Sequence, residues 1–441
     1  GKEIRISELG EDGFRFRLAE ECPEPEQFLI CFYDMKKAGY RRVEIRRFEM
    51  SAAEEQCLQD QQPSEKETGK YFYREYSVRV EQKDYVQEVR RLAGEYNRYI
   101  RLKLEGDDGE LAKSLTGYPA ELDGMHCRSL EEQKKRWFFR ESEKASGNPQ
   151  NTMGTEELRL LDNAEFALEL NCTSLYEEYL RQPLQDFLAS YWQKNYLTHS
   201  YFAGRTPDRF YIGNQFCHLL FPERKLLFEI IEKAAAEQVK ITLVFSYIRE
   251  YMLDYITELL DEINRWCEEK RQSVEIVVND WGMASLVKKS RRNLIPSLGI
   301  LLNKRRKDPR IPFKKGEQKW FERNSLNAGF YRNFLEREYG IQRFEWESCG
   351  YEQQIPPGKN SLHIPFYQTN TSQYCPLGAV CETGERGRQK LAKKCPGYCT
   401  EYALLYPEHL HMIGRYNSLF GIDMMILKEE EILKNYIQNG V

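Results

Sequence analysis

Short apolar runs alternate with longer amphipathic stretches in the second half of the chain. Six strand-like runs occur there, and helical patterns separate most of them. The runs are Arg209–Gly213, Lys240–Phe245, Val274–Val278, Ser297–Leu302, Ile341–Trp346 and His363–Tyr367. Strands at this spacing favour a parallel sheet. Because there are so many units and no dinucleotide-binding glycine pattern, the sequence predicts an α/β fold with a (β/α) TIM-like barrel. An open doubly wound sheet is the alternative.

The first part of the chain has a different pattern. A charged helical stretch over Val86–Tyr96 lies among short strand-like runs that show no periodic repeat. These runs are Phe28–Tyr33, Tyr71–Val80 and Tyr99–Leu104. Residues 141–157 are rich in Ser, Gly, Asn and Thr, a composition typical of a linker or an exposed loop. We therefore expect the first part to form a domain of its own.

Length and pattern together predict three parts. A chain of 441 residues is long enough for two or three domains. We expect a smaller α+β accessory domain over residues 1–140, followed by a linker and connecting helices over residues 141–204. The barrel should span residues 205–441.

Composition narrows the class of protein. Hydrophobic residues make up 41% and charged residues 30%, as in ordinary soluble globular proteins. The formal net charge of −4 argues against an overall positive field for nucleic acid. No run approaches the ~20 apolar residues of a membrane-spanning helix, and the start of the sequence lacks the apolar run of a secretory signal. A cytoplasmic protein is expected.

Cysteine is the residue type that points most clearly to chemistry. The chain has 12 cysteines, and a long chain without a signal favours reduced thiols, a metal site or catalysis over disulfides. Four cysteines lie close together near the C-terminal end of the sequence. They are Cys375, Cys381, Cys395 and Cys399. Four thiolates provide a complete ligand set for zinc or for an iron–sulfur cluster.

The spacing of the four cysteines favours an iron–sulfur cluster over zinc. Zinc sites usually contain C-x₂-C pairs, and neither pair here has that spacing. A proline follows Cys375 directly and another follows Cys395, which suits a loop wrapped around a 4Fe–4S cluster. The C-x₃-C-x₂-C pattern of radical enzymes is absent from the sequence. Zinc is the alternative metal. Cys217, just after the first predicted barrel strand, is a candidate to replace one of the four ligands, because strand ends converge in a barrel.

Polar residues follow several predicted strands, where barrel enzymes bind their substrates. Residues of this kind also end strands for reasons of turn geometry alone. A basic run begins at Asn303, and its arginines suit a carboxylate, a phosphate or an RNA backbone; a solvated charged loop is the alternative. The candidate substrate-binding residues are Asn279, Asp280, Asn303, Arg305 and Arg306.

Several short strings resemble the collagenase-like peptidase family U thirty-two over roughly residues 205–425. The string Tyr374-Cys-Pro-Leu-Gly378 is the most specific of them. The others are Tyr211-Ile-Gly213, Val278-Asn-Asp-Trp-Gly282, Asn303-Lys-Arg-Arg306, Asp308-Pro-Arg310, Asn324-Ser-Leu-Asn327, Cys395-x₃-Cys399, His411-Met-Ile and Asn417-Ser418.

The resemblance implies a barrel with a 4Fe–4S cluster on four cysteines. The matching positions are those of the C-terminal group, and Cys217 resembles the upstream ligand of the ubiquinone branch. Members of the family carry out oxygen-independent hydroxylation of the ubiquinone ring or of RNA bases, with prephenate proposed as oxygen donor in some branches. A small anionic or aromatic substrate, or RNA, is therefore expected as the partner.

Two other functions remain open. A peptidase, as the family label implies, needs an activated nucleophile or a metal-bound water. The sequence contains neither H-E-x-x-H nor G-x-S-x-G, so this hypothesis is weaker. The other is a non-enzymatic, cluster-bearing subunit that docks a protein partner through residues 1–200.

Overall fold

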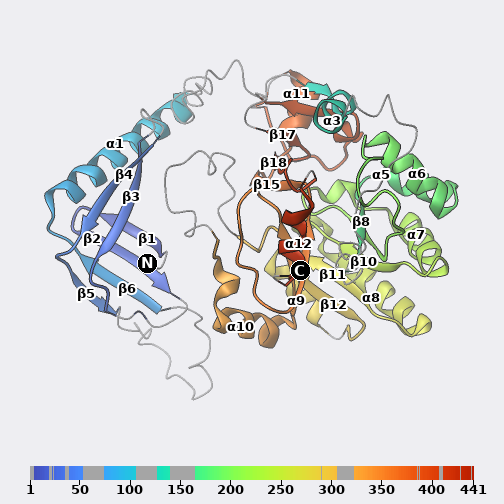
Figure 1. The fold of residues 1–441 in the computed structure, drawn as a ribbon, viewed down its shortest axis with the longest axis horizontal. Helices are drawn as coiled ribbons and strands as arrows, with labels where there is room; N and C mark the ends of the chain where they lie inside the picture. Colours follow the sequence, from blue (N-terminus) through green and yellow to red (C-terminus); the bar gives the residue numbers. More distant parts are fainter. Residues whose placement is uncertain are drawn as a thin grey trace. The chain divides into compact units, whose positions relative to one another are not determined.

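The computed structural model divides the chain into two compact units. The first comprises Gly1–Asp123 with Lys314–Phe334, and the second comprises Gly124–Phe313 with Leu335–Val441. Figure 1 shows the elements of both. The structure describes residues 4–18, 22, 24–34, 39–52, 74–105, 127–139, 164–289, 291–304, 322–384, 386, 388–406, 411–427, 429–438 and 440–441.

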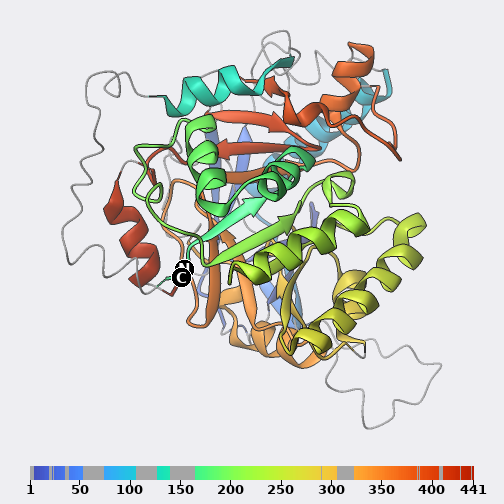
Figure 2. The same cartoon turned by 90° about the vertical axis from the view of Figure 1, so that its right-hand side faces the viewer.

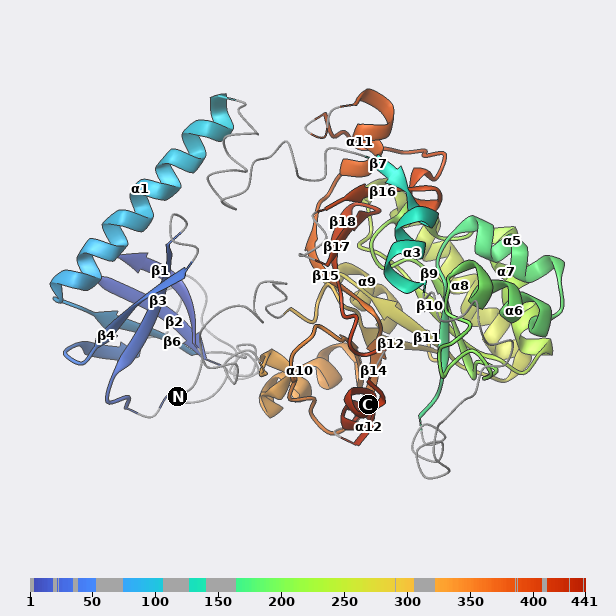
Figure 3. The same cartoon turned by 45° about the horizontal axis from the view of Figure 1, so that its top comes forward.

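The first unit contains an antiparallel sheet, a hairpin and one long helix. The four-stranded sheet has the order β1-β2-β6-β5, and the hairpin pairs β3 with β4. Figure 3 shows helix α1 beside these strands. The bounds are β1 Arg5–Gly10, β2 Gly13–Leu18, β3 Phe28–Asp34, β4 Gly39–Ile45, β5 Glu49–Ala52, β6 Arg74–Arg79 and α1 Lys83–Glu105.

Aromatic side chains fill the core of the first unit. Alternate residues of β2 face inward, and Phe16 is fully buried against Phe28. Tyr85 at the start of α1 is buried too, and its hydroxyl donates 2.7 Å hydrogen bonds to the carbonyls of Gly10 and Gly13. These bonds tie α1 to the β1–β2 turn.

Helix α1 corrects one prediction from the sequence. The run Tyr99–Leu104 is not a strand, because α1 continues through it to Glu105. The alternation of Arg and Lys with Ile and Leu resembles a strand, but most of these residues are also good helix formers and no breaker separates them from the preceding turns.

The second unit is built on a seven-stranded parallel sheet with the order β14-β13-β12-β11-β10-β9-β8. Spatial order therefore follows sequence order, which is the winding of a barrel and not of a doubly wound sheet. The strands are β8 Ala167–Leu170, β9 Arg209–Gly213, β10 Lys240–Val244, β11 Val274–Val278, β12 Leu294–Leu298, β13 Arg343–Glu347 and β14 Lys359–His363.

The sheet curls into a half-barrel. His363 on β14 and Glu169 on β8 come from the two ends of the strand order, yet their side chains meet at 2.7 Å. Helices flank the sheet, as Figures 1 and 2 show. They are α5 Thr173–Arg181, α6 Leu184–Lys194, α7 Arg224–Ala236, α8 Leu253–Lys270, α9 Trp281–Lys288 and α10 Gly329–Tyr339.

The parallel sheet agrees with the sequence prediction in its middle and differs at its ends. Strand β8 lies in the segment predicted as a linker, so the sheet begins before residue 205. The last predicted run, His363–Tyr367, contains the end of β14 and the start of β15, which belongs to another sheet. The α/β class is confirmed, and the part of the chain predicted to form a TIM-like barrel contains a curled half-barrel of parallel strands.

A second, antiparallel sheet carries the C-terminal cysteines. Its order is β15-β18-β17-β16-β7. Strand β7 pairs with β16, so a segment predicted for the accessory domain belongs to the second unit. The elements are β7 Cys127–Ser129, α3 Leu130–Phe138, β15 Phe366–Thr371, α11 Pro376–Thr383, β16 Tyr402–Leu405, β17 Met412–Arg415, β18 Ser418–Ile422 and α12 Glu430–Gln438.

The packing of the second unit joins the antiparallel sheet to the cysteine-bearing segments. Cys399 is buried in an apolar cluster with Leu377 of α11 and Phe420 of β18, and Cys217, Cys375 and Cys381 pack against the same cluster. Within the described part of the chain, every helix is too short or too polar to cross a membrane.

Candidate functional site

Cys375 begins helix α11 and holds its first turn. Its sulfur accepts a hydrogen bond from the Gly378 backbone N–H at 3.2 Å, and its thiol donates to the Tyr416 carbonyl at 2.9 Å. Pro376 takes the first helical position, where a missing N–H costs nothing. The Cys-Pro-Leu-Gly string is thus a helix start that fixes one thiol beside the β17–β18 turn.

The other cysteines reach this place from different elements. Cys395 is exposed, and its sulfur accepts a hydrogen bond from the Gly397 N–H at 3.4 Å. Cys399 lies in a buried single turn at Tyr398–Thr400. Cys217 follows β9, where its N–H donates to the Asn214 side chain at 3.0 Å.

Several of these thiols raise one another's pKa. The pKa of Cys217 is raised to about 12, mainly by burial and in part by the thiols of Cys375 and Cys395. The pKa of Cys399 is likewise raised to about 12, mainly by burial and in part by the thiols of Cys217, Cys375 and Cys395. Cys381 and Cys395 both raise the pKa of Tyr398, after a larger effect of burial.

Three of the four predicted cysteines, Cys375, Cys395 and Cys399, thus influence one another and Cys217 electrostatically, whereas Cys381 packs against the same apolar cluster as Cys217 and Cys375. No group of three or more His, Cys, Asp or Glu side chains within the described ranges is arranged to hold a metal ion.

The predicted substrate residues at the strand ends are engaged with backbone groups. Asn279 is only 4% exposed; its amide donates to the Phe245 carbonyl at 2.8 Å and its oxygen accepts from the Leu301 N–H at 3.0 Å. Asp280 caps α9 by accepting from the Met283 N–H at 2.8 Å. These side chains brace neighbouring strand ends, in line with the turn interpretation of such residues.

Asn303 has a similar role. It is buried, and its amide donates to the Glu345 carbonyl at 2.8 Å. Arg305 and Arg306 lie outside the described residues, so their predicted role as an anion site stays a prediction.

Replacing Asn279 with alanine should lower the free energy of unfolding by about 2 kcal/mol, because two buried backbone groups lose their partners. Urea unfolding followed by tryptophan fluorescence measures this loss. The control is Asn370→Ala on β15, an exposed position where the expected change is within ~0.5 kcal/mol. If both variants lost the same unfolding free energy, the Asn279 side chain would not stabilise the neighbouring strand ends.

The inner face of the half-barrel carries a polar cluster that the sequence pattern did not reveal. At its centre is Glu345 on β13, which is fully buried. Its carboxylate accepts from the Ser297 hydroxyl at 2.6 Å and from the Tyr211 hydroxyl at 3.2 Å, and it contacts His363 Nε2 at 3.0 Å. Three strands far apart in sequence thus supply groups to one buried acid.

His363 lies between two carboxylates. Its other nitrogen, Nδ1, is 2.7 Å from Glu169. Burial alone would lower the pKa of His363, but its bonds to Glu169 and Glu345 raise it to about 10. The imidazole is therefore protonated at neutral pH and donates from both nitrogens.

A second layer of charge lies closer to the start of the strands. Glu275 pairs with Arg209 at 3.0 Å and with Arg343 at 3.1 Å. Arg343 also donates to Ser361 at 3.2 Å, and the Ser361 hydroxyl lies 3.0 Å from the Tyr211 hydroxyl. The two layers form one hydrogen-bonded network of alternating charges.

A sequence signal for this cluster does exist. Polar residues recur at every second position of strands whose other face is apolar, as in Arg343-x-Glu345-x-Glu347 and Ser361-x-His363. Such alternation places all of these side chains on one face of the sheet, and in a curled sheet this is the inner face.

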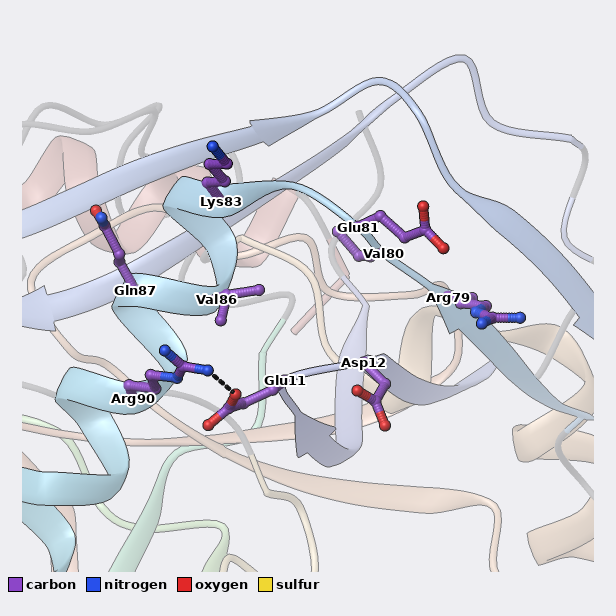
Figure 4. A pocket seen from close by; sticks show the side chains of 9 residues that line it. All are labelled: Glu11, Asp12, Arg79, Val80, Glu81, Lys83, Val86, Gln87 and Arg90. Atoms are coloured by element: carbon purple, nitrogen blue, oxygen red, sulfur yellow. Dashed lines mark hydrogen bonds and ion pairs between the residues drawn. The ribbon is translucent and has the colours of Figure 1, made fainter.

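Figure 4 shows a pocket of the first unit, where the β1–β2 turn meets the start of α1. Its cavity volume is ≈ 450 Å³. Arg90 is paired with Glu11 at 2.7 Å, and Lys83 and Glu81 are exposed around it. Mixed and solvated charges of this kind give no convergent binding geometry.

Comparisons of the whole chain with protein-family models, with curated proteins and with solved structures gave no match.

Proposed function

We propose that this protein is an iron–sulfur enzyme of the barrel class, with a 4Fe–4S cluster held by thiols beside the carboxyl ends of the parallel strands. The observation that carries the proposal is the convergence of Cys217 with Cys375, Cys395 and Cys399 across more than 150 positions of sequence. Free cysteines have no packing reason to gather in this way.

The donor set suits a cluster. Backbone N–H groups of Gly378 and Gly397 point at two of the sulfurs, and hydrogen bonds of this type tune iron–sulfur clusters. Cys395 lies at an exposed position. Cys381 and Cys217 compete for the fourth position, and zinc remains the alternative metal.

The polar cluster on the inner face of the half-barrel suits proton transfer. A bound cluster would supply redox or Lewis-acid chemistry. Glu345 and Tyr211 would hold or move a proton within the half-barrel, and protonated His363, bonded to Glu169 and Glu345, would keep the Glu345 carboxylate oriented. Oxygen-independent hydroxylation of an aromatic ring or of a nucleic-acid base, as the family resemblance implies, would use both parts. This reaction class and its RNA or ring substrate remain part of the proposal.

The test is metal analysis of protein purified without oxygen. Iron, acid-labile sulfide and zinc should be measured together with the visible spectrum, and about four irons and four sulfides per chain are expected. To identify the ligands, each of five cysteines is replaced with alanine in turn: Cys217, Cys375, Cys381, Cys395 and Cys399. Four of these five variants should lose the iron.

The control is Cys267→Ala in α8, a buried cysteine that packs in a helix and should keep full iron. One zinc per chain without sulfide would overturn the redox proposal and leave a structural metal site. Iron that survives all five substitutions would overturn the ligand assignment.

A further inference from the structure

A basic segment leads from helix α11 to the exposed Cys395. Residues 386–394 contain five basic side chains and no acidic one. The five are Arg386, Arg388, Lys390, Lys393 and Lys394. The last four of them are exposed, and Leu391 in their midst keeps 42% of its surface accessible. The proposed ligand Cys395 therefore lies at the end of a strongly charged surface.

Two contacts hold the basic segment against the loops that carry the other thiols. The Gln389 side chain accepts a hydrogen bond at 3.2 Å from the hydroxyl of Ser372, which lies three positions before the first thiol of the C-terminal group. The Lys393 ammonium lies 5.6 Å from the centre of the Tyr251 ring. The Tyr251 hydroxyl is 2.7 Å from Nε2 of His218, the residue after the thiol that follows β9. These contacts fix the positive charges beside the proposed cluster ligands.

Carboxylates near the basic segment balance only part of its charge. Lys390 pairs with Glu382 at 3.4 Å, but the lysine keeps 74% of its side-chain surface accessible. Glu250 is exposed beside Tyr251, and Glu385 lies outside the described residues. Three carboxylates thus stand against five cations. Since the whole chain has a formal net charge of −4, the positive field is confined to this surface.

The make-up of this surface favours a protein partner over a single-stranded nucleic acid. Nucleic acids stack their bases on free aromatic faces beside such charges. The Tyr251 ring is covered by Lys393 and packs against His218 at a centroid distance of 6.0 Å. Leu391 offers an apolar contact with charges around it, as protein interfaces have. Electron-carrier proteins bind through small contacts of this kind, steered by opposite charge.

We infer that residues 386–394 form the docking surface for a small acidic electron-carrier protein of the ferredoxin or flavodoxin class. The inference rests on the proposed function, because the carrier would exchange electrons with a cluster that Cys395 helps to hold. One electron passes in each encounter, and no covalent bond forms or breaks. Hydroxylation that takes its oxygen atom from water releases two electrons, which two oxidised carriers would accept in turn. The exposed position of Cys395 places the proposed cluster close to the docked carrier.

The first readout is binding of an oxidised [2Fe–2S] ferredoxin and of an oxidised flavodoxin to the full-length protein, followed by fluorescence anisotropy of the labelled carrier. Saturable binding of at least one carrier is expected, and high salt should weaken it about tenfold or more. Replacing two lysines together, Lys390→Glu and Lys394→Glu, should weaken it by a similar factor. The matched control is Lys225→Glu in α7, since Lys225 is 91% exposed and, like Lys390, pairs with a single glutamate.

The second readout is electron transfer. Reduced flavodoxin is mixed with the cluster-containing protein in a stopped-flow instrument, and the flavin absorbance reports the electron that leaves the carrier. The bimolecular rate should fall in the double variant by about the same factor as the affinity. Iron content and the visible spectrum of the variant should match those of the wild type. If the double variant loses iron, Lys390→Glu alone decides, because it lies five positions from Cys395.

Iron analysis of the same preparations separates this inference from the proposed function. A cluster-containing protein that binds neither carrier, or binds one equally well after the charge reversal, would overturn the docking surface and leave the proposed function standing. Absence of iron would overturn the proposed function, and electron delivery with it. A short single-stranded RNA is the third probe. RNA that binds through the same lysines, while neither carrier binds, would also overturn the inference and assign the surface to nucleic acid.

Discussion

The stability that His363 gives the second unit should be lost as the pH rises from about 7 to about 10. The folded protein holds the His363 proton with a pKa of about 10, whereas the ordinary value is 6.5. Below pH 6.5 both states are protonated and the full stabilisation is present. Between the two values only the folded state binds the proton, so the contribution falls by about 1.4 kcal/mol per pH unit.

The measured quantity is the difference in unfolding free energy between the wild type and His363→Gln at each pH. Taking this difference removes the effects of other groups that titrate in the window, such as Lys134, whose lowered pKa has the opposite sign of effect. Urea unfolding followed by tryptophan fluorescence suits the purpose, because five of the six tryptophans belong to the second unit. They are Trp137, Trp192, Trp266, Trp281 and Trp346.

The control variant is His411→Asn. His411 is exposed, and asparagine tolerates its positive φ of 51°. This variant should track the wild type at every pH. A constant difference between the wild type and His363→Gln would mean that the imidazole is neutral in the folded protein.

The strands that the sequence predicts well are those whose signal is local. Strands β9, β10 and β11 are short apolar runs between helices, and their predicted and observed bounds agree within a residue. The predicted run for β12 starts at Ser297, three residues late, because Pro296 within a central strand argues against that assignment. Pro296 nevertheless pairs in register with Ile276. Strand β8 has only four residues and no local feature that separates it from a loop.

The two parts of the candidate site differ in how far sequence reveals them. The C-terminal cysteines stand close together in the chain, so their clustering is visible directly. The polar cluster depends on pairs such as Glu169 and His363, which are 194 positions apart. Only the curl of the sheet brings them together, and local periodicity carries no information about that curl. The strand-end residues could not be assigned from sequence because turn geometry and ligand binding favour the same residue types.

Gly213 links the fold to the candidate site, since it ends β9 just before Asn214 and Cys217. Its φ is +120°, a conformation that residues with a side chain rarely adopt. A Cβ at this position would overlap the Val244 carbonyl oxygen and lie 3.0 Å from the Phe221 ring. The obstacle includes backbone of the neighbouring strand, which cannot rotate away as a side chain can.

Gly213→Ala should therefore destabilise the second unit far more than strain at φ alone would do. Gly358→Ala is the matched control, because Gly358 has a similar φ of +142° but no heavy atom within 4 Å of the methyl group that alanine would add. Its strain should cost about 1–3 kcal/mol. Gly213→Ala should cost about 2 kcal/mol more, the usual range for overpacking, measured by urea unfolding of both variants. Equal losses would mean that β9 and β10 can move apart at this point. In that case the position of Cys217 relative to the other thiols would be adjustable, and a cluster could draw it in without a penalty from the sheet.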